Sequence, residues 1–71
     1  MEEGRVECRA EYTYPQRPIA VWWAGQRLPV TAVETEWRTP GGRAFRVRCE
    51  GGECFELFYH EGENRWLVKL L

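Results

Sequence analysis

Apolar and polar positions alternate along most of the chain, and this period of two predicts β-strands that bury one face. In the first predicted strand, residues 5–12, one face carries Val6, Cys8, Ala10 and Tyr12. A stiff, proline-rich connection follows at residues 14–18. Four later segments have turn composition: Gly25-Gln26, Pro40-Gly41-Gly42, Gly51-Gly52 and Glu61-Gly62-Glu63-Asn64. The remaining segments are therefore predicted to be strands joined by hairpins, and no segment has a helical period.

Matching apolar positions across these turns predicts a register for each hairpin. The expected neighbours are Trp23 and Leu28, Trp37 and Phe45, Cys49 and Phe55, and Tyr59 and Trp66. The third hairpin needs a loop of odd length, because a two-residue loop would set arginines against apolar residues. On the outer face the same registers pair Glu36 with Arg46, Glu34 and Glu56 with Arg48, and Glu56 with Lys69. The basic positions of this face are thus expected to form a solvated ladder of ion pairs.

The strand predicted at residues 27–37 contains one conflict. Its inward positions are even up to Ala32 and odd from Val33 to Trp37, so a β-bulge is expected near Ala32 and Val33. A long bent strand of this kind allows a small barrel to close. We predict a single all-β domain over residues 1–71, a five- to six-stranded antiparallel meander that forms a small SH3-like barrel. The alternative is an open twisted sheet.

Composition narrows the function classes. The formal net charge of −1 provides no global positive field for nucleic acid. No apolar run is long enough to span a membrane, and the acidic start differs from a signal peptide. We therefore expect a cytoplasmic protein that makes no membrane contact. The three cysteines are an odd number and are expected to stay reduced.

Cys8, Cys49, Cys54 and His60 are the residues that could form a zinc site. They lack a CxxC spacing, and the predicted register points Cys49 and Cys54 to opposite faces. We expect Cys8 and Cys49 to be buried as small apolar residues, with no metal and no cofactor. Cys54 and His60 lie six positions apart on one strand, roughly 20 Å, too far for a catalytic pair. No other catalytic motif is recognisable, so we predict that the protein is not an enzyme.

Trp22 is the most conspicuous candidate contact, because Trp23 already occupies the core side of the same strand. Trp22 is either covered by the N-terminal strand or connection, or exposed as an anchor for a partner. Phe58 and Leu67 form a second outward apolar pair, with Leu71 nearby. Four arginines have no partner in the predicted register: Arg17, Arg27, Arg38 and Arg43.

Five stretches carry a resemblance: Arg17-Pro18-Ile19-Ala20-Val21-Trp22, Trp37-Arg38, Phe45-Arg46-Val47-Arg48, Glu56-Leu57-Phe58 and Arg65-Trp66-Leu67-Val68. From Arg17 onward they resemble a small uncharacterised bacterial family, a domain of unknown function. Its members are sometimes associated with proteins related to translesion polymerases. The shared positions are aromatic and apolar, so the resemblance implies a common fold and assigns no functional residue.

The expected function is a non-catalytic binding module, accessory to DNA repair or replication through contact with single-stranded nucleic acid. The candidate contacts are Trp22, Arg17, Arg27, Arg38, Phe58 and Leu67. The alternative is a protein-interaction domain that binds a larger protein or forms a homodimer.

Overall fold

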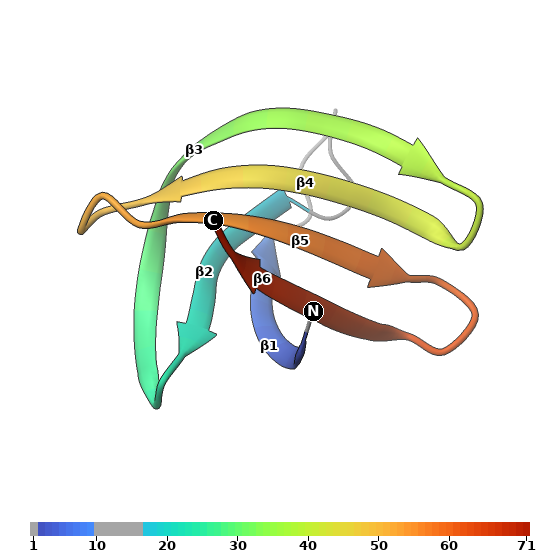
Figure 1. The fold of residues 1–71 in the computed structure, drawn as a ribbon, viewed down its shortest axis with the longest axis horizontal. Coiled ribbons are helices and arrows are strands. Elements are labelled where there is room, and N and C mark those ends of the chain that lie inside the picture. The colour runs from blue at the N-terminus through green and yellow to red at the C-terminus, as the bar shows by residue number, and fades with distance from the viewer. Residues whose placement is uncertain (1, 10–16) are drawn as a thin grey trace.

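Six antiparallel strands form a closed barrel in the computed structural model, which describes residues 2–9 and 17–71. The strands are β1 (Glu2–Arg9), β2 (Arg17–Trp23), β3 (Gln26–Thr39), β4 (Gly42–Cys49), β5 (Cys54–His60) and β6 (Arg65–Leu70). Each strand pairs with the next, and β1 pairs with β6 to close the sheet (Figure 1). The predicted all-β meander, consistent with a small SH3-like barrel, is confirmed, and the open-sheet alternative is wrong. Residues 10–16, which include the predicted end of the first strand and most of the connection, lie outside the described residues.

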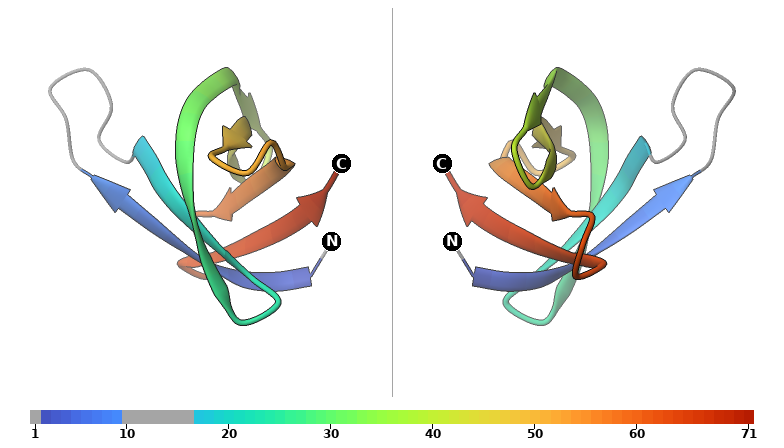
Figure 2. Two further views of the ribbon diagram at one scale, coloured as in Figure 1. Left: turned by 90° about the vertical axis from the view of Figure 1, so that its left-hand side faces the viewer. Right: turned by 90° about the vertical axis from the view of Figure 1, so that its right-hand side faces the viewer.

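The long strand β3 belongs to both halves of the barrel. Its residues 26–29 pair with β2, and its residues 30–39 pair with β4. The register shifts on both sides of Ala32 and Val33, between Val30 and Ala32 and between Val33 and Thr35. These irregularities confirm the predicted bulged strand, and bulges increase local bend and twist. Figures 1 and 2 show β3 bending and arching over the top of the barrel.

The first hairpin turns one residue earlier than predicted, at Ala24-Gly25. Both residues have positive φ, 51° and 77°, as a type I′ turn requires. Trp23 therefore faces Gln26, while Leu28 faces Val21, so the predicted pairing of Trp23 with Leu28 is wrong. Because each partner moved by two positions, every side chain keeps its predicted face.

The second hairpin closes with the two-residue loop Pro40-Gly41. This loop sets Glu36 opposite Phe45 and Trp37 opposite Ala44, one position away from the predicted register. A shift of one residue turns side chains to the other face of the sheet. Trp37 is consequently 36% exposed on the outside instead of buried opposite Phe45.

The last two hairpins agree better with prediction. The third has the expected odd-length loop. Its register differs by two positions, because Phe55 faces Val47 and Arg48 faces Cys54, so the predicted pairing of Phe55 with Cys49 is wrong. The fourth has the predicted register, with Tyr59 opposite Trp66.

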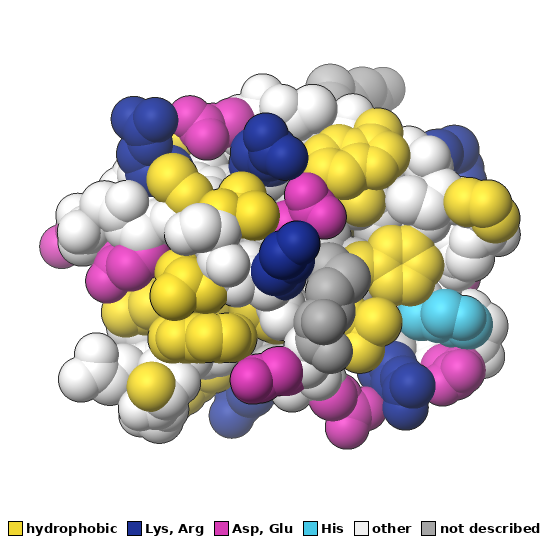
Figure 3. Space-filling view, viewed as in Figure 1, with side chains coloured by type: hydrophobic (Ala, Val, Ile, Leu, Met, Phe, Trp, Pro, Cys, Tyr) yellow, Lys and Arg dark blue, Asp and Glu magenta, His cyan; other side chains and the backbone are white. Residues whose placement is uncertain are grey.

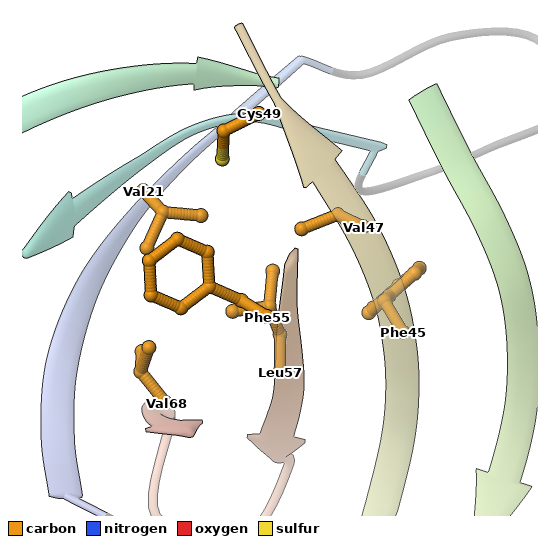
Figure 4. Close-up of a cluster of buried hydrophobic side chains, with 7 residues drawn as sticks. All are labelled: Val21, Phe45, Val47, Cys49, Phe55, Leu57 and Val68. Atoms are coloured by element: carbon orange, nitrogen blue, oxygen red, sulfur yellow. The ribbon is translucent and has the colours of Figure 1, made fainter. Parts of the chain in front are cut away.

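The core is a cluster of fully buried side chains from β2, β4, β5 and β6. Its members are Val21, Phe45, Val47, Cys49, Phe55, Leu57 and Val68 (Figure 4). Trp23 packs on Phe55 with ring centroids 5.4 Å apart, and Val6 adds a partly buried side chain from β1. Full burial of such side chains stabilises the fold by roughly 1.5–3 kcal/mol each. Cys8 is exposed, contrary to prediction, because the β1–β2 register shifts between Glu7 and Cys8 and breaks the alternation.

The seam that closes the barrel is short. It consists of the pairs Glu2 with Val68, Glu3 with Leu67, and Gly4 with Trp66. A Cβ atom on Gly4 would lie 2.6 Å from Cγ2 of Val68, which is closer than side-chain atoms approach. The absence of a side chain at this position allows β1 to approach β6.

Candidate functional site

Trp22 lies in the middle of a row on the outer face of β1, β2 and β3, opposite Arg5 on one side and Arg27 on the other. Its indole Nε1 donates a hydrogen bond to Oε1 of Glu7 at 3.2 Å. The guanidinium carbon of Arg5 lies 5.0 Å from the centre of the ring, within the range of a cation–π contact. Trp22 is half-buried and its polar atom is satisfied, so the structure favours the covered alternative over an exposed anchor.

Glu7 joins Trp22 to Arg27. The Nε and Nη2 atoms of Arg27 donate to the carboxylate of Glu7 at 3.0–3.1 Å. The hydrogen bonds from Arg27 lower the pKa of Glu7 below its ordinary value, although partial desolvation opposes them. The expectation that Arg27 has no partner is therefore wrong, and Arg17 is not free either.

The three arginines of β4 also form ion pairs with glutamates. Arg48 lies 3.0 Å from Glu34, as predicted. Glu36 forms its ion pair with Arg43, at 3.2 Å, and not with Arg46 as predicted. Glu56 forms its ion pair with Arg46, at 3.3 Å, and not with Arg48. Glu56 keeps its predicted position opposite Lys69. The pairs of Arg46 and Arg48 keep the predicted ladder on the outer face. Glu36 lies opposite Phe45 and therefore on the core side of the sheet with Arg43, so the outer-face position predicted for Glu36 is wrong.

Arg38 is the most loosely held of the candidate arginines. Its guanidinium lies 3.9 Å from Glu61, and its side chain is 77% exposed. An ion pair at this distance and exposure contributes little to stability. Arg38 is thus available to a binding partner. The prediction that it has no ion-pair partner is wrong, because Glu61 lies within 4 Å.

An apolar row crosses the outer face from β3 to β6. Successive pairings align Trp37, Ala44, Phe58 and Leu67, which we call the outer band. Phe58 and Leu67 are half-buried, and Ala44 between its larger neighbours is only 3% exposed. Figure 3 shows hydrophobic side chains gathered on this face beside the histidine. The predicted Phe58–Leu67 pair is therefore part of a longer surface.

His60 borders the outer band at the end of β5. Its ring meets that of Phe58 edge-on, with centroids 6.0 Å apart. Its Nδ1 accepts a hydrogen bond from the backbone N–H of Glu63 at 3.1 Å, which fixes the ring against the β5–β6 turn. A side chain that the backbone of the β5–β6 turn holds in place therefore borders the outer band.

Trp37 is the candidate residue that the sequence-based reasoning missed. The signal was the dipeptide Pro40-Gly41, which fills a two-residue turn and leaves Gly42 as the first residue of β4. A Cβ atom on Gly42 would lie 1.9 Å from the carbonyl oxygen of Tyr59. Glycine is therefore needed at this position for the close approach of β4 to β5, and not for the turn. Counting Gly42 into the turn moved Trp37 to the wrong face.

The candidate metal ligands do not converge. Among the described residues, no three His, Cys, Asp or Glu side chains are grouped closely enough to hold a metal ion. Cys49 is buried as predicted, and burial raises the pKa of its thiol to about 11. Within residues 2–9 and 17–71 there is also no helix long and apolar enough to cross a membrane.

Comparison with known proteins found no matching family model, curated protein or solved structure. The described part of the chain also forms no pocket. The outer band, an open and slightly curved sheet surface, is accordingly the candidate functional site.

Proposed function

We propose that this domain is a binding module whose partner is another protein, contacted through the outer band. The observation that carries the proposal is the alignment of Trp37, Phe58 and Leu67 on one exposed sheet face. Aromatic residues, above all tryptophan, contribute disproportionately to protein interfaces, and contiguous apolar surface on a small domain commonly marks such a site.

The charge distribution supports a protein partner over single-stranded nucleic acid. Binding of nucleic acid without sequence preference needs a positively charged track beside the aromatic rings. Six arginines of the described chain lie within 4 Å of a glutamate: Arg27, Arg38, Arg43, Arg46, Arg48 and Arg65. Beside the band, Arg46 is paired with Glu56, so the two charges largely cancel. A mixed polar rim around an apolar centre is typical of protein interfaces.

The test uses the full chain with Phe58→Glu or Leu67→Glu, each of which places a charge in the middle of the band. Leu71→Glu is the matched control: Leu71 is 52% exposed, and its backbone N–H donates to the carbonyl oxygen of Cys54 at the start of β5, four positions from Phe58 and so farther from the pair than expected. A partner captured with the wild-type chain would be identified, purified and titrated against all variants by calorimetry. We expect at least tenfold weaker binding for the two band variants and unchanged binding for Leu71→Glu.

Two results would contradict the proposal. One is equal binding of the partner by the band variants and the wild type. The other is salt-sensitive binding of a single-stranded oligonucleotide, measured by fluorescence anisotropy, with no protein bound by the band; this would favour the nucleic-acid hypothesis instead.

A further inference from the structure

Among the described residues, the part of β3 from residue 30 to residue 39 has one unpaired edge. Only residues 26–29 of this strand pair with β2, whereas residues 30–39 pair with β4 on the other side. Within the described part of the chain, no strand pairs with the remaining edge of residues 30–39, which forms the upper border of the sheet in Figure 1. The register shifts distort this edge up to Thr35. Residues 35–39 are regular, and a regular free edge can accept another strand.

The hairpin geometry determines which backbone groups this edge offers. Residues that flank a two-residue loop exchange hydrogen bonds with each other, and such pairs alternate along an antiparallel ladder. Thr39 flanks the loop, so Thr39 and Trp37 direct their backbone groups towards β4. Glu36 and Arg38 direct theirs away from β4, to the free edge. Each of these two residues therefore presents one N–H and one carbonyl to an incoming strand.

The sequence of the edge is complementary to a second, antiparallel copy of itself. Residues 35–39 read Thr-Glu-Trp-Arg-Thr. In an antiparallel pair centred on Trp37, Thr35 would face Thr39, Glu36 would face Arg38, and Trp37 would face its own copy. Aromatic, threonine and opposite-charge pairs are the favourable cross-strand neighbours. The backbone agrees, because Glu36 and Arg38 carry the outward hydrogen-bonding groups and would form two doubly bonded pairs.

We propose that two copies of this chain form a two-fold symmetric dimer by antiparallel pairing of their β3 edges, centred on Trp37. This inference deepens the proposed function, on which it rests, by naming a second copy as the partner at the Trp37 end of the outer band. Pairing joins the two outer bands into one continuous row across both sheets. The symmetry is isologous, so the interface closes on itself and does not propagate into a fibre.

The side chains along the edge favour pairing and limit its length. Glu36 leans back towards Arg43 on β4 and is half-buried, so it does not project as a charge that blocks the edge. Arg38 is exposed and held only by the long contact to Glu61. Pro40 has no N–H and ends the ladder on one side, and the register shift before Thr35 ends it on the other. An interface this short predicts weak dimerisation, with a dissociation constant on the order of 10–100 µM.

Sedimentation equilibrium of the full chain over micromolar to millimolar concentrations tests the proposal. We expect the average mass to rise towards twice the chain mass. Arg38→Glu sets two glutamates against each other at both symmetric positions, which should weaken the dimer about 30-fold. Glu36→Arg should weaken it in the same way. An equimolar mixture of the two variants restores both opposite-charge pairs and should dimerise again. Lys69→Glu makes the same change in charge outside the edge and should leave the dimer intact.

Hydrogen exchange provides a second readout that needs no variant. The backbone amides of Glu36 and Arg38 should exchange more slowly as the wild-type concentration rises, whereas those of Thr35 and Trp37, already directed at β4, should not change. Exchange at Glu36 and Arg38 that is independent of concentration would overturn the dimer, as would a wild-type chain that stays monomeric at millimolar concentration.

Failure of the dimer and failure of the proposed function give different results. If the wild type is monomeric but a purified partner still loses affinity on Phe58→Glu, the dimer is wrong and the proposed function stands. If the wild type is monomeric and the Phe58 and Leu67 variants bind every partner as well as the wild type does, both are wrong. A dimer that resists Arg38→Glu also refutes the β3 pairing.

Discussion

A methyl group added at Gly4 tests how tightly the barrel seam is packed. In Gly4→Ala the new Cβ would lie 2.6 Å from Cγ2 of Val68 and 3.3 Å from its Cβ. Overpacking of this kind costs about 1–3 kcal/mol, and replacing glycine by alanine in a strand returns about 0.5–1 kcal/mol. We therefore expect the single variant to lower the free energy of unfolding by about 1–2 kcal/mol.

Val68→Ala removes the methyl group that the new Cβ would strike. Val68 is 1% exposed, so the change alone should cost about 2–3 kcal/mol for two buried methyl groups and the space that they leave. In the double variant the 2.6 Å contact no longer exists, and the methyl group introduced by Gly4→Ala fills part of the space. The double variant should therefore be about 1–2 kcal/mol more stable than the sum of the single effects predicts.

Urea unfolding of the four proteins in this cycle measures the coupling directly. The matched control combines Gly4→Ala with Val47→Ala, because Val47 is equally buried but lies on β4, and no atom of it approaches the position of a Gly4 Cβ. The control pair should be additive. Additivity within about 0.5 kcal/mol for Gly4 and Val68 as well would refute the close approach of β1 to β6.

Three further predictions concern single sites. The Arg27 hydrogen bonds lower the pKa of Glu7, so their stabilising effect is present above the ordinary glutamate value of 4.5 and is lost as pH falls through the lower, folded-state pKa. Arg27→Ala should raise the pKa of Glu7 in an NMR titration, and an unchanged value would contradict the assigned cause. Cys49, with its pKa raised to about 11 and its side chain buried, should react with alkylating reagent at pH 8 only when the protein unfolds, as peptide mapping by mass spectrometry would show; rapid labelling in the native state would mean that the site opens. Gly42→Ala should prevent native folding, seen as loss of the native circular dichroism spectrum, because its Cβ would lie 1.9 Å from the carbonyl oxygen of Tyr59, and a stable, native-like variant would show that the strands can separate there.

The architecture was predictable because the turns are marked by their composition and most errors in register were errors of two. Moving Trp23 from Leu28 to Gln26 leaves it on the core side, since side chains two apart share a face. The bulge near Ala32 and Val33 was visible as a change in the parity of apolar positions. The exact loop residues were not predictable, because Ala24-Gly25 in a type I′ turn and Gly25-Gln26 in a type II′ turn both include a glycine, and both turn types match the twist of the strands.

The candidate site was predictable in part. The Phe58–Leu67 pair followed from the last hairpin, whose register was predicted correctly. Trp37 was missed because an error of one residue reverses the face of a side chain. The partner of Arg27 was missed because Glu7 lies 20 residues away on a strand that is not its neighbour in the sheet. Glu7 and Arg27 come together only through the register of β1 beside β2. That register cannot be predicted by matching residues within each hairpin separately.

The seam also has a consequence for how the chain folds. The hairpins from β2 to β6 join segments that are close in sequence, whereas Glu3 and Arg65 meet across 62 residues. Closing so long a loop costs chain entropy that only three residue pairs offset. We therefore expect the seam between β1 and β6 to form after the hairpins and to open first. Substitutions at Gly4 should act mainly on the unfolding limb of a stopped-flow chevron and leave the folding rate nearly unchanged.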